Sequence, residues 1–238
     1  RAIADQASKL IHCSNYFNID LQEKVAEKLV EHSGLEAVFF CNSGLEANEC
    51  AIKIARKFGH TKGIEVPNII VLKHAFHGRS IATLSATGNP SVREDFSPYT
   101  EGFIFVDESD LNGIRKIVEE NKNVVAIFFE PILGEGGVVP IDLSVIKGIR
   151  EICDEHDLLM MCDEVQCGMG RSGKWFAHQW AEIKPDVITM AKGLAGGVPV
   201  GAVIVSEKAN IFFEKQTSDF PFHPRRGSGL HRRHRQSP

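Results

Sequence analysis

The chain has 238 residues, of which 43% are hydrophobic and 24% are charged. This length suffices for one large core or two small ones, and the composition excludes a disordered, collagen-like or coiled-coil protein. The formal net charge of −4 argues against a nucleic-acid partner, and neither a bilayer-spanning apolar run nor a secretory leader is visible, so we expect a cytoplasmic protein without a membrane partner.

Apolar runs of strand length alternate with stretches of helical period along most of the chain. This alternation predicts an α/β domain with a mostly parallel, buried, seven-stranded sheet flanked by helices. The predicted strands are Ala37 to Cys41, Asn68 to Leu72, Phe103 to Val106, Val124 to Phe129, Leu158 to Cys162, Val187 to Met190 and Val200 to Val205. Helical period is clear in Gly44 to Phe58 and in Leu143 to His156. Loops at the carboxyl ends of the strands are therefore the expected ligand sites.

The first predicted strand leads through a Ser-Gly turn into an amphipathic helix. Ser43 and Gly44 thus lie at a helix N-terminus, where free N–H groups and the positive end of the helix dipole suit a phosphate group. The same residues also fit an ordinary N-cap, in which Ser43 caps the helix and Glu46 completes a capping box. Both interpretations stay open, and the loop matches neither a P-loop nor a GxGxxG fingerprint.

Acids follow the fifth predicted strand and a lysine follows the sixth. A carboxylate at Asp163 or Glu164 can hold a cationic ring nitrogen, a metal or a basic substrate, or can cap a turn. Lys192 stands beside glycines at a strand end, where loss of solvent lowers the pKa of an amine and favours Schiff-base chemistry. The alternative for Lys192 is a side chain that reaches the surface.

A phosphate cradle, a carboxylate and a lysine at neighbouring strand ends match the needs of pyridoxal 5'-phosphate. That cofactor requires an anchor for its phosphate, an anion beside its pyridine nitrogen and a lysine partner. The histidines and cysteines show no metal-site spacing, and the six cysteines predict reduced, buried thiols.

Five segments in the appropriate order resemble the class III pyridoxal-phosphate aminotransferases. They are residues 42–49, 75–80, 130–137, 163–171 and 191–201, within a match from about Ala2 to Phe213. The resemblance implies fold type I, with residues 1–215 as the cofactor-binding large domain, its N-terminus incomplete and the C-terminal small domain missing. It also implies a homodimer with active sites at the subunit interface.

The resemblance assigns roles around the cofactor ring. Lys192 is the implied catalytic residue, which holds the cofactor covalently and then moves a proton. Asp163 pairs with the pyridine nitrogen and Gln166 hydrogen-bonds the phenolic oxygen. Val165 and Phe76 contact opposite faces of the ring, although Phe76 read alone would more often be a core residue.

Further roles concern the phosphate and the substrate. Gly44 and Leu45 give N–H groups to the phosphate, and Ser43 adds a hydroxyl. Arg79 binds a substrate carboxylate or acyl oxygen, for which a surface arginine is the alternative. Glu135 is the implied gating acid, for which a solvated turn acid is the alternative.

Some positions near these motifs bear on the pocket. Glu130 is expected to support the cofactor surroundings. Leu45, Leu133 and Cys167 depart from the family pattern; Leu45 keeps its backbone amide, whereas Leu133 and Cys167 are expected to alter pocket polarity.

The implied reaction moves the terminal amine of N2-acetylornithine to 2-oxoglutarate, giving N-acetylglutamate 5-semialdehyde and glutamate, a step of arginine biosynthesis. Succinylornithine, ornithine, putrescine and 4-aminobutyrate are alternative amine donors. A non-catalytic remnant of such an enzyme is a further alternative, because the segment and domain that the family pattern places next are absent from the sequence.

The last residues differ in composition from the body. Residues 221–238 contain five arginines and no acid, which leaves 22 basic and 31 acidic groups, a net charge of −9, for the first 220 residues. We expect residues 216–238 to be a disordered basic tail whose composition resembles out-of-frame translation, with a basic arm for an acidic partner as the alternative.

Overall fold

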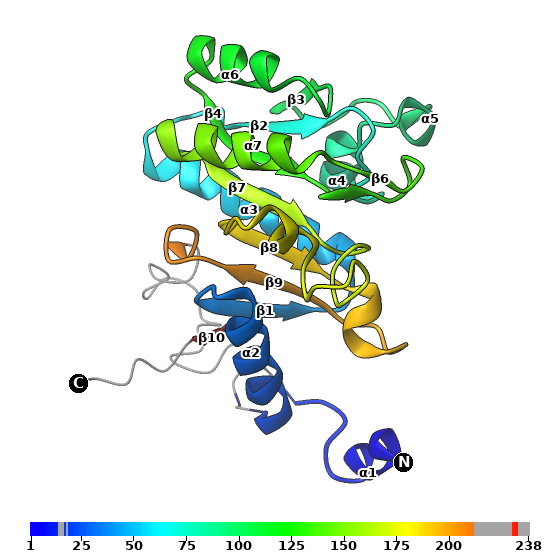
Figure 1. The fold of residues 1–238 in the computed structure, drawn as a ribbon. Coiled ribbons are helices and arrows are strands. Elements are labelled where there is room, and N and C mark those ends of the chain that lie inside the picture. Colours follow the sequence, from blue (N-terminus) through cyan, green and yellow to red (C-terminus); the bar gives the residue numbers. More distant parts are fainter. Residues whose placement is uncertain (14–16, 18, 212–229, 233–238) are drawn as a thin grey trace, which may run out of the picture.

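A computed structural model describes residues 1–13, 17, 19–211 and 230–232. Most of these residues surround one sheet whose strands are stacked from β3 at the top to β10 at the bottom of Figure 1. The strands of the main sheet are β1 (Ala37–Cys41), β2 (Asn68–Leu72), β3 (Phe103–Val106), β4 (Val124–Phe129), β7 (Leu159–Asp163), β8 (Val187–Met190), β9 (Gly201–Val205) and β10 (Leu230–Arg232). A separate hairpin pairs β5 (Ile132–Leu133) with β6 (Val139–Pro140).

The strand order is β10-β1-β9-β8-β7-β4-β2-β3. Strands β3, β2, β4, β7 and β8 pair in parallel, whereas β9 runs antiparallel between β8 and β1. The predicted α/β architecture with seven mostly parallel strands is therefore confirmed. The eighth strand, β10, differs from the prediction of a disordered tail, because it pairs antiparallel with the outer side of β1, a sheet edge with backbone groups available for pairing. The rest of residues 216–238 lies outside the described residues.

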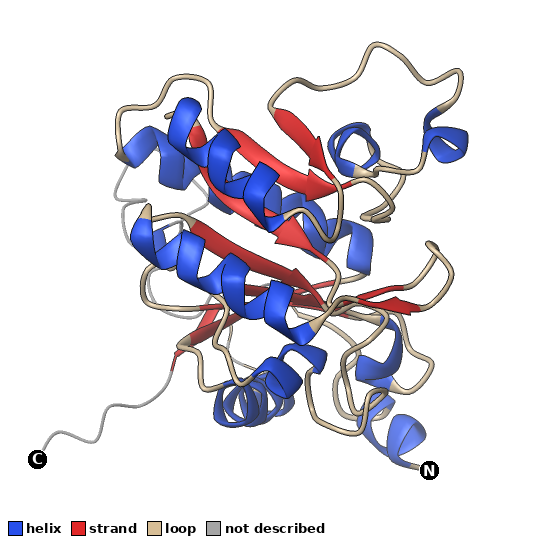
Figure 2. Ribbon diagram, turned by 45° about the horizontal axis from the view of Figure 1, so that its top comes forward, coloured by secondary structure: helices blue, strands red, loops and turns tan. Residues whose placement is uncertain are grey.

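Helices cover both faces of the sheet, as Figure 2 shows. The α-helices of the described residues are α1 (Ala2–Ala7), α2 (Asp20–Ser33), α3 (Gly44–Thr61), α4 (Ile81–Ala86), α5 (Pro90–Arg93), α6 (Leu111–Glu120) and α7 (Leu143–Glu155), and the 3-10 helices are η1 (Ala177–Ala181) and η2 (Lys192–Ala195). Helix α3 packs on one face, and α2, α6 and α7 pack on the other.

Successive side chains along each strand point to opposite faces of the sheet and so divide the core between these faces. Ile69 and Val71 of β2 pack in the cluster that contains α3, whereas Ile70 and Leu72 pack in the cluster that contains α6 and α7. All four side chains are fully buried. Strands buried on both faces are continuously apolar, which explains why short apolar runs predicted them.

The topology brings several loops to one edge. The carboxyl ends of β1, β2, β4, β7 and β8 meet there because these strands run in the same direction, and the amino end of the antiparallel β9 reaches the same edge. Among the described residues, no helix has both the length and the apolar character needed to span a membrane.

Candidate active site

The turn after β1 forms the start of α3. Ser43 is the N-cap residue, and its side chain accepts a hydrogen bond from the Glu46 amide at 3.2 Å. The Glu46 carboxylate accepts from the Asn42 amide at 2.6 Å, one residue before the position that a capping box would use. The amides of Gly44 and Leu45 have no acceptor within the described part of the chain. The cap and the anion cradle are therefore compatible, since capping leaves these two N–H groups free.

Two glycines allow the turn to approach its neighbours. A Cβ on Gly44 would lie 2.7 Å from a methyl carbon of Val165, and one on Gly201 would lie 2.3 Å from the Ser43 carbonyl oxygen. Glycine at these positions therefore lets β9 and the loop after β7 pack against the turn.

Asp163 ends β7 as a buried carboxylate, 3% exposed. Its Oδ2 lies 2.7 Å from Asn48 Nδ2 and 2.8 Å from His77 Nδ1, while Oδ1 accepts from the Val165 amide at 3.0 Å. These donors stabilise a negative charge at the cavity wall, where it can face a cationic group.

Asn48 and His77, the partners of Asp163, were not predicted from the sequence. Asn48 also donates to the His77 carbonyl oxygen at 2.8 Å, and the His77 ring stacks on Phe128 with the centroids 4.0 Å apart. A usable signal for Asn48 was its place in the first turns of α3, four residues after Gly44 and hence on the same helix face. His77 has no such local signal.

The neighbouring acid, Glu164, faces away from this cluster. Its carboxylate accepts from the amides of Ala177 and His178 at 2.8 and 2.9 Å, and it lies 2.9 Å from His178 Nδ1. Consecutive side chains of an extended segment point in opposite directions, so Asp163 serves the cavity while Glu164 holds η1 in place.

Glu130, after β4, is a second buried carboxylate. Burial and the nearby negative charge of Asp163 raise the pKa of its carboxyl from 4.5 to about 7, although His77 and two backbone hydrogen bonds act in the opposite direction.

Lys192 begins η2, and its Nζ donates to Gln166 Oε1 at 2.7 Å. Of the two interpretations of Lys192, the structure agrees with a side chain that reaches the surface and not with loss of solvent, because the side chain is exposed at the mouth of a cavity. Its φ of 41° lies in the left-handed region, which is unusual for a residue other than glycine. Backbone strain of this kind concentrates at functional sites, where the surroundings hold it in place.

These groups line one cavity of about 560 Å³. Its lining residues are Asn42, Ser43, Gly44, Leu45, Asn48, Phe76, His77, Gly78, Arg79, Glu130, Asp163, Val165, Gln166, Ala191, Lys192, Gly197, Val198, Pro199 and Val200. The structure thus brings together every predicted site residue except Glu135, which lies on an exposed turn outside this lining. Arg79 is exposed, and its guanidinium has no ion-pair partner among the described residues.

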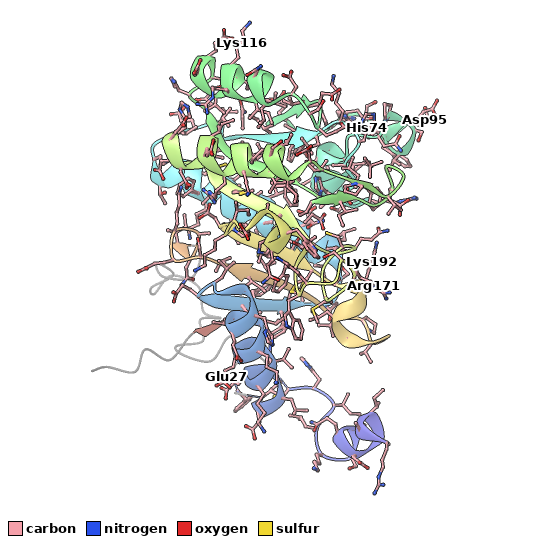
Figure 3. The ribbon with its side chains drawn as sticks, viewed as in Figure 1. Glu27, His74, Asp95, Lys116, Arg171 and Lys192 are labelled. Carbon is pink, nitrogen blue, oxygen red and sulfur yellow. The ribbon has the colours of Figure 1, made fainter. Side chains whose placement is uncertain are left out.

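A second cavity of about 590 Å³ adjoins the first through Gln166, Lys192 and Gly197. Arg171 also lines it, and Figure 3 shows Arg171 and Lys192 at the same edge of the molecule. No acid lines this second cavity, so its charge suits an anion.

The donor set fits the pyridoxal phosphate that the resemblance implies. The cavity volume is typical of small-molecule sites. Free amides at Gly44 and Leu45 suit a phosphate, the carboxylate of Asp163 suits a ring cation, and the amine of Lys192 suits an aldehyde. Among the described residues, no group of three or more His, Cys, Asp or Glu side chains could hold a metal ion.

Comparison with protein families gives a match to aminotransferase class-III over residues 1–220. The acetylornithine aminotransferase of Nitrosomonas europaea is 50% identical over 214 residues, covering 90% of this chain and 54% of that protein. The acetylornithine aminotransferase of Synechocystis is 47% identical over 218 residues, covering 89% and 51%. The chain therefore spans about half the length of the curated relatives it matches.

Solved structures of aminotransferases also superpose on this chain. The ornithine aminotransferase of Toxoplasma gondii superposes with a TM-score of 0.85 at 31% identity, covering 93% of this chain and 53% of that one. The N-acetylornithine aminotransferase of Stenotrophomonas maltophilia superposes with a TM-score of 0.75 at 38% identity, covering 87% and 52%.

Proposed function

The chain belongs to the class-III aminotransferase family, and we propose that its cavity binds pyridoxal 5'-phosphate and carries out transamination. The observation that carries this proposal is the placement of Lys192 and Asp163 in one cavity with the free amides of Gly44 and Leu45. When bound, pyridoxal phosphate supplies an aldehyde and an electron-accepting ring.

The residues of this chain have distinct roles in the proposed site. Gly44, Leu45 and Ser43 bind the phosphate through two amides and a hydroxyl. Asp163, held by Asn48 and His77, keeps a proton on the ring nitrogen, because a buried carboxylate favours a cation beside it.

The second group of roles concerns the ring and the proton. Phe76 and Val165 confine the ring, and Gln166 orients it through its phenolic oxygen. Lys192 Nζ accepts and returns the proton at the substrate carbon, and its present bond to Gln166 places the amine in the cavity.

We propose N2-acetylornithine as the amine donor and 2-oxoglutarate as the acceptor, in the cytoplasm and as part of arginine biosynthesis. The names of the relatives that are about half identical support this choice. Arg79 supports it chemically, because an unpaired guanidinium in the cavity can bind a carboxylate. Glu135 is proposed to pair with a substrate-binding arginine, and a second copy of the chain is proposed to complete a homodimer.

A second candidate differs only in the amine donor. The likeness to ornithine aminotransferases favours ornithine, since the superposition covers 93% of this chain. The two candidates use the same cofactor residues and differ in whether the α-amine of the donor is acetylated.

Reconstitution of the chain with pyridoxal phosphate tests the proposal. We expect a visible absorption band that Lys192→Ala removes, because the alanine has no amine to react with the aldehyde. Lys184→Ala is the matched control, since Lys184 is a lysine that does not line the cavity. No band at all would contradict cofactor binding, and a band that survives Lys192→Ala would contradict the role of Lys192.

Single-turnover measurements then identify the donor. N2-acetylornithine, succinylornithine, ornithine, putrescine and 4-aminobutyrate are offered in turn, and we expect the acetylated donor to bleach the band fastest. Arg79→Ala should slow donors that carry a carboxylate by about tenfold or more and leave putrescine unchanged, because putrescine has no carboxylate. If no donor bleaches the band, the chain binds the cofactor without turning over.

A further inference from the structure

The carboxylate of Glu130 bridges two loops of the cavity. It is 4% exposed, and each of its oxygens accepts a different backbone amide. Oε1 accepts from Phe76 at 2.7 Å, in the loop after β2, and Oε2 accepts from Gly134 at 3.0 Å, in the turn between β5 and β6. Phe76 and Gly134 are 58 positions apart along the chain, and the side chain of Glu130 joins them through these two hydrogen bonds.

The turn at Gly134 reaches the lysine through one further contact. A Cβ on Gly134 would lie 2.4 Å from Gln166 Oε1, so the side chain of Gln166 packs directly on the backbone of this turn. The same Oε1 accepts the hydrogen bond from Lys192 Nζ. Glu130 is thus connected to the ring-facing residue Phe76 on one side and to the amine on the other.

We propose that Glu130 is a positioning residue whose two carboxylate oxygens fix the loop at Phe76 and the turn at Gly134 relative to each other. One side chain thereby fixes the positions of both the ring contact and the amine of Lys192. The inference rests on the proposed function, because Phe76 and Lys192 are there the residues that meet the cofactor. Glu130 itself acts through its neighbours.

The ionised carboxylate makes both bonds at full strength. In a protonated carboxyl the hydroxyl oxygen is a weaker acceptor, and in a glutamine the NH2 group accepts nothing and would face a backbone N–H. Protonation therefore weakens the hold on one of the two loops, and the glutamine removes it. The titratable groups that face Glu130 are Asp163, whose negative charge raises the pKa of the Glu130 carboxyl, and His77, which lowers it.

Nuclear magnetic resonance of the cofactor-free, isotope-labelled full chain tests the bridge directly. In a titration from about pH 5.5 to about pH 8.5, we expect the amide signals of Phe76 and Gly134 to move with a single shared midpoint near 7. The side-chain amide signal of Gln166 should follow the same midpoint, which a purely structural acid elsewhere in the core would not produce.

Glu130→Gln is the decisive variant, and Glu135→Gln is its matched control. Glu130→Gln should abolish the shared titration, whereas Glu135→Gln removes a charge from the same turn and should leave it intact. If Phe76 and Gly134 titrate with different midpoints, or still titrate together in Glu130→Gln, the bridge does not exist. If Glu130→Gln fails to fold, the shared or separate midpoints of the unmodified chain still decide the question.

Cofactor affinity gives the second readout. Glu130→Gln should raise the Kd for pyridoxal phosphate by about tenfold, the effect of losing one charge-assisted hydrogen bond. Glu130→Asp should not restore the Kd of the unmodified chain, because a side chain one methylene shorter cannot reach both amides. An unchanged Kd in both variants would overturn the positioning role. Failure of the unmodified chain to bind the cofactor would instead contradict the proposed function and leave the amide titration to judge the bridge.

Discussion

Glu130 makes the stability of the fold depend on pH. The pKa of its carboxyl is about 7 in the folded chain and 4.5 in the reference state, so the folded chain keeps a proton that the unfolded chain has released. Its contribution to the free energy of unfolding is therefore greatest below pH 4.5, falls as the pH rises to about 7, and stays low above that. The total fall is about 3 kcal/mol at most.

Urea unfolding at about pH 5 and about pH 8 measures this contribution. Glu130→Gln carries no titrating proton, so its free energy of unfolding should fall less between the two pH values than that of the unmodified chain. Glu135→Gln changes an exposed acid and should behave like the unmodified chain. An equal fall in Glu130→Gln would show that burial does not raise the pKa of this carboxyl.

At the scale of single residues, the sequence predicted some features of the site and not others. The position after a buried strand left open whether Asp163 or Glu164 faces a ligand or caps a turn, and the family resemblance selected Asp163; the structure places Asp163 in the cavity lining. Two interpretations of Lys192 were left open; the exposed side chain agrees with the one in which it reaches the surface and not with loss of solvent, a choice that the composition around the residue does not reveal. The left-handed φ of Lys192 is equally invisible in the sequence, since the favoured residue there would be glycine.

At the scale of elements, the junction of β1 and α3 depends on contact with the loop after β7. The α-carbon of Gly44 lies so near Val165 that an added methyl group would meet its side chain at 2.7 Å. Gly44→Ala should therefore displace Val165 and weaken pyridoxal phosphate binding by about tenfold, which corresponds to the lower end of the roughly 1 to 3 kcal/mol that overpacking costs.

A double-mutant cycle separates this clash from other effects of the alanine. Val165→Ala removes the methyl groups that Gly44→Ala would meet, so the double variant should bind the cofactor no worse than Val165→Ala alone. The measurement is the Kd for pyridoxal phosphate in all four proteins. Additive losses would mean that Gly44 acts through its backbone conformation instead of through Val165.

The sequence predicts where helices and strands lie better than it predicts the direction in which a strand runs in the sheet. All seven strands of the predicted sheet are present because buried strands are continuously apolar, and the apolar face of α3 was visible from its period. The antiparallel direction of β9 was not predictable in this way, since an apolar run reads the same for both directions. The pairing of β10 with β1 has no local signal either, because it joins residues almost 200 positions apart.

At the scale of the whole molecule, the site exists because distant segments meet at one edge of the sheet. Asp163 bonds to Asn48 and to His77, which are 115 and 86 positions away. Such partners follow from the strand order, which separates β1 from β7 by β9 and β8. The motifs predicted most of the groups that line the cavity, whereas the groups that hold Asp163 in place follow only from the topology.

Ligand binding should consequently stabilise the entire sheet. The cavity takes residues from the loops after β1, β2, β4, β7 and β8, so unfolding of any one of these elements would disrupt the site. Pyridoxal phosphate at 100 times its Kd should raise the free energy of unfolding by about 2.7 kcal/mol. For a chain of this size, that corresponds to a rise in Tm of roughly 5 to 10 °C.

Thermal unfolding with three ligands assigns this stabilisation to parts of the site. Pyridoxal lacks the phosphate that the amides of Gly44 and Leu45 would bind, and 4'-deoxypyridoxine 5'-phosphate lacks the aldehyde that the amine of Lys192 would meet. At equal concentrations, both should raise the Tm less than pyridoxal phosphate, and Lys192→Ala should remove the difference between the aldehyde and its deoxy analogue. If pyridoxal stabilised the chain as much as its phosphate ester, the start of α3 would not be the phosphate anchor, because the helix N-terminus would then add nothing to the affinity.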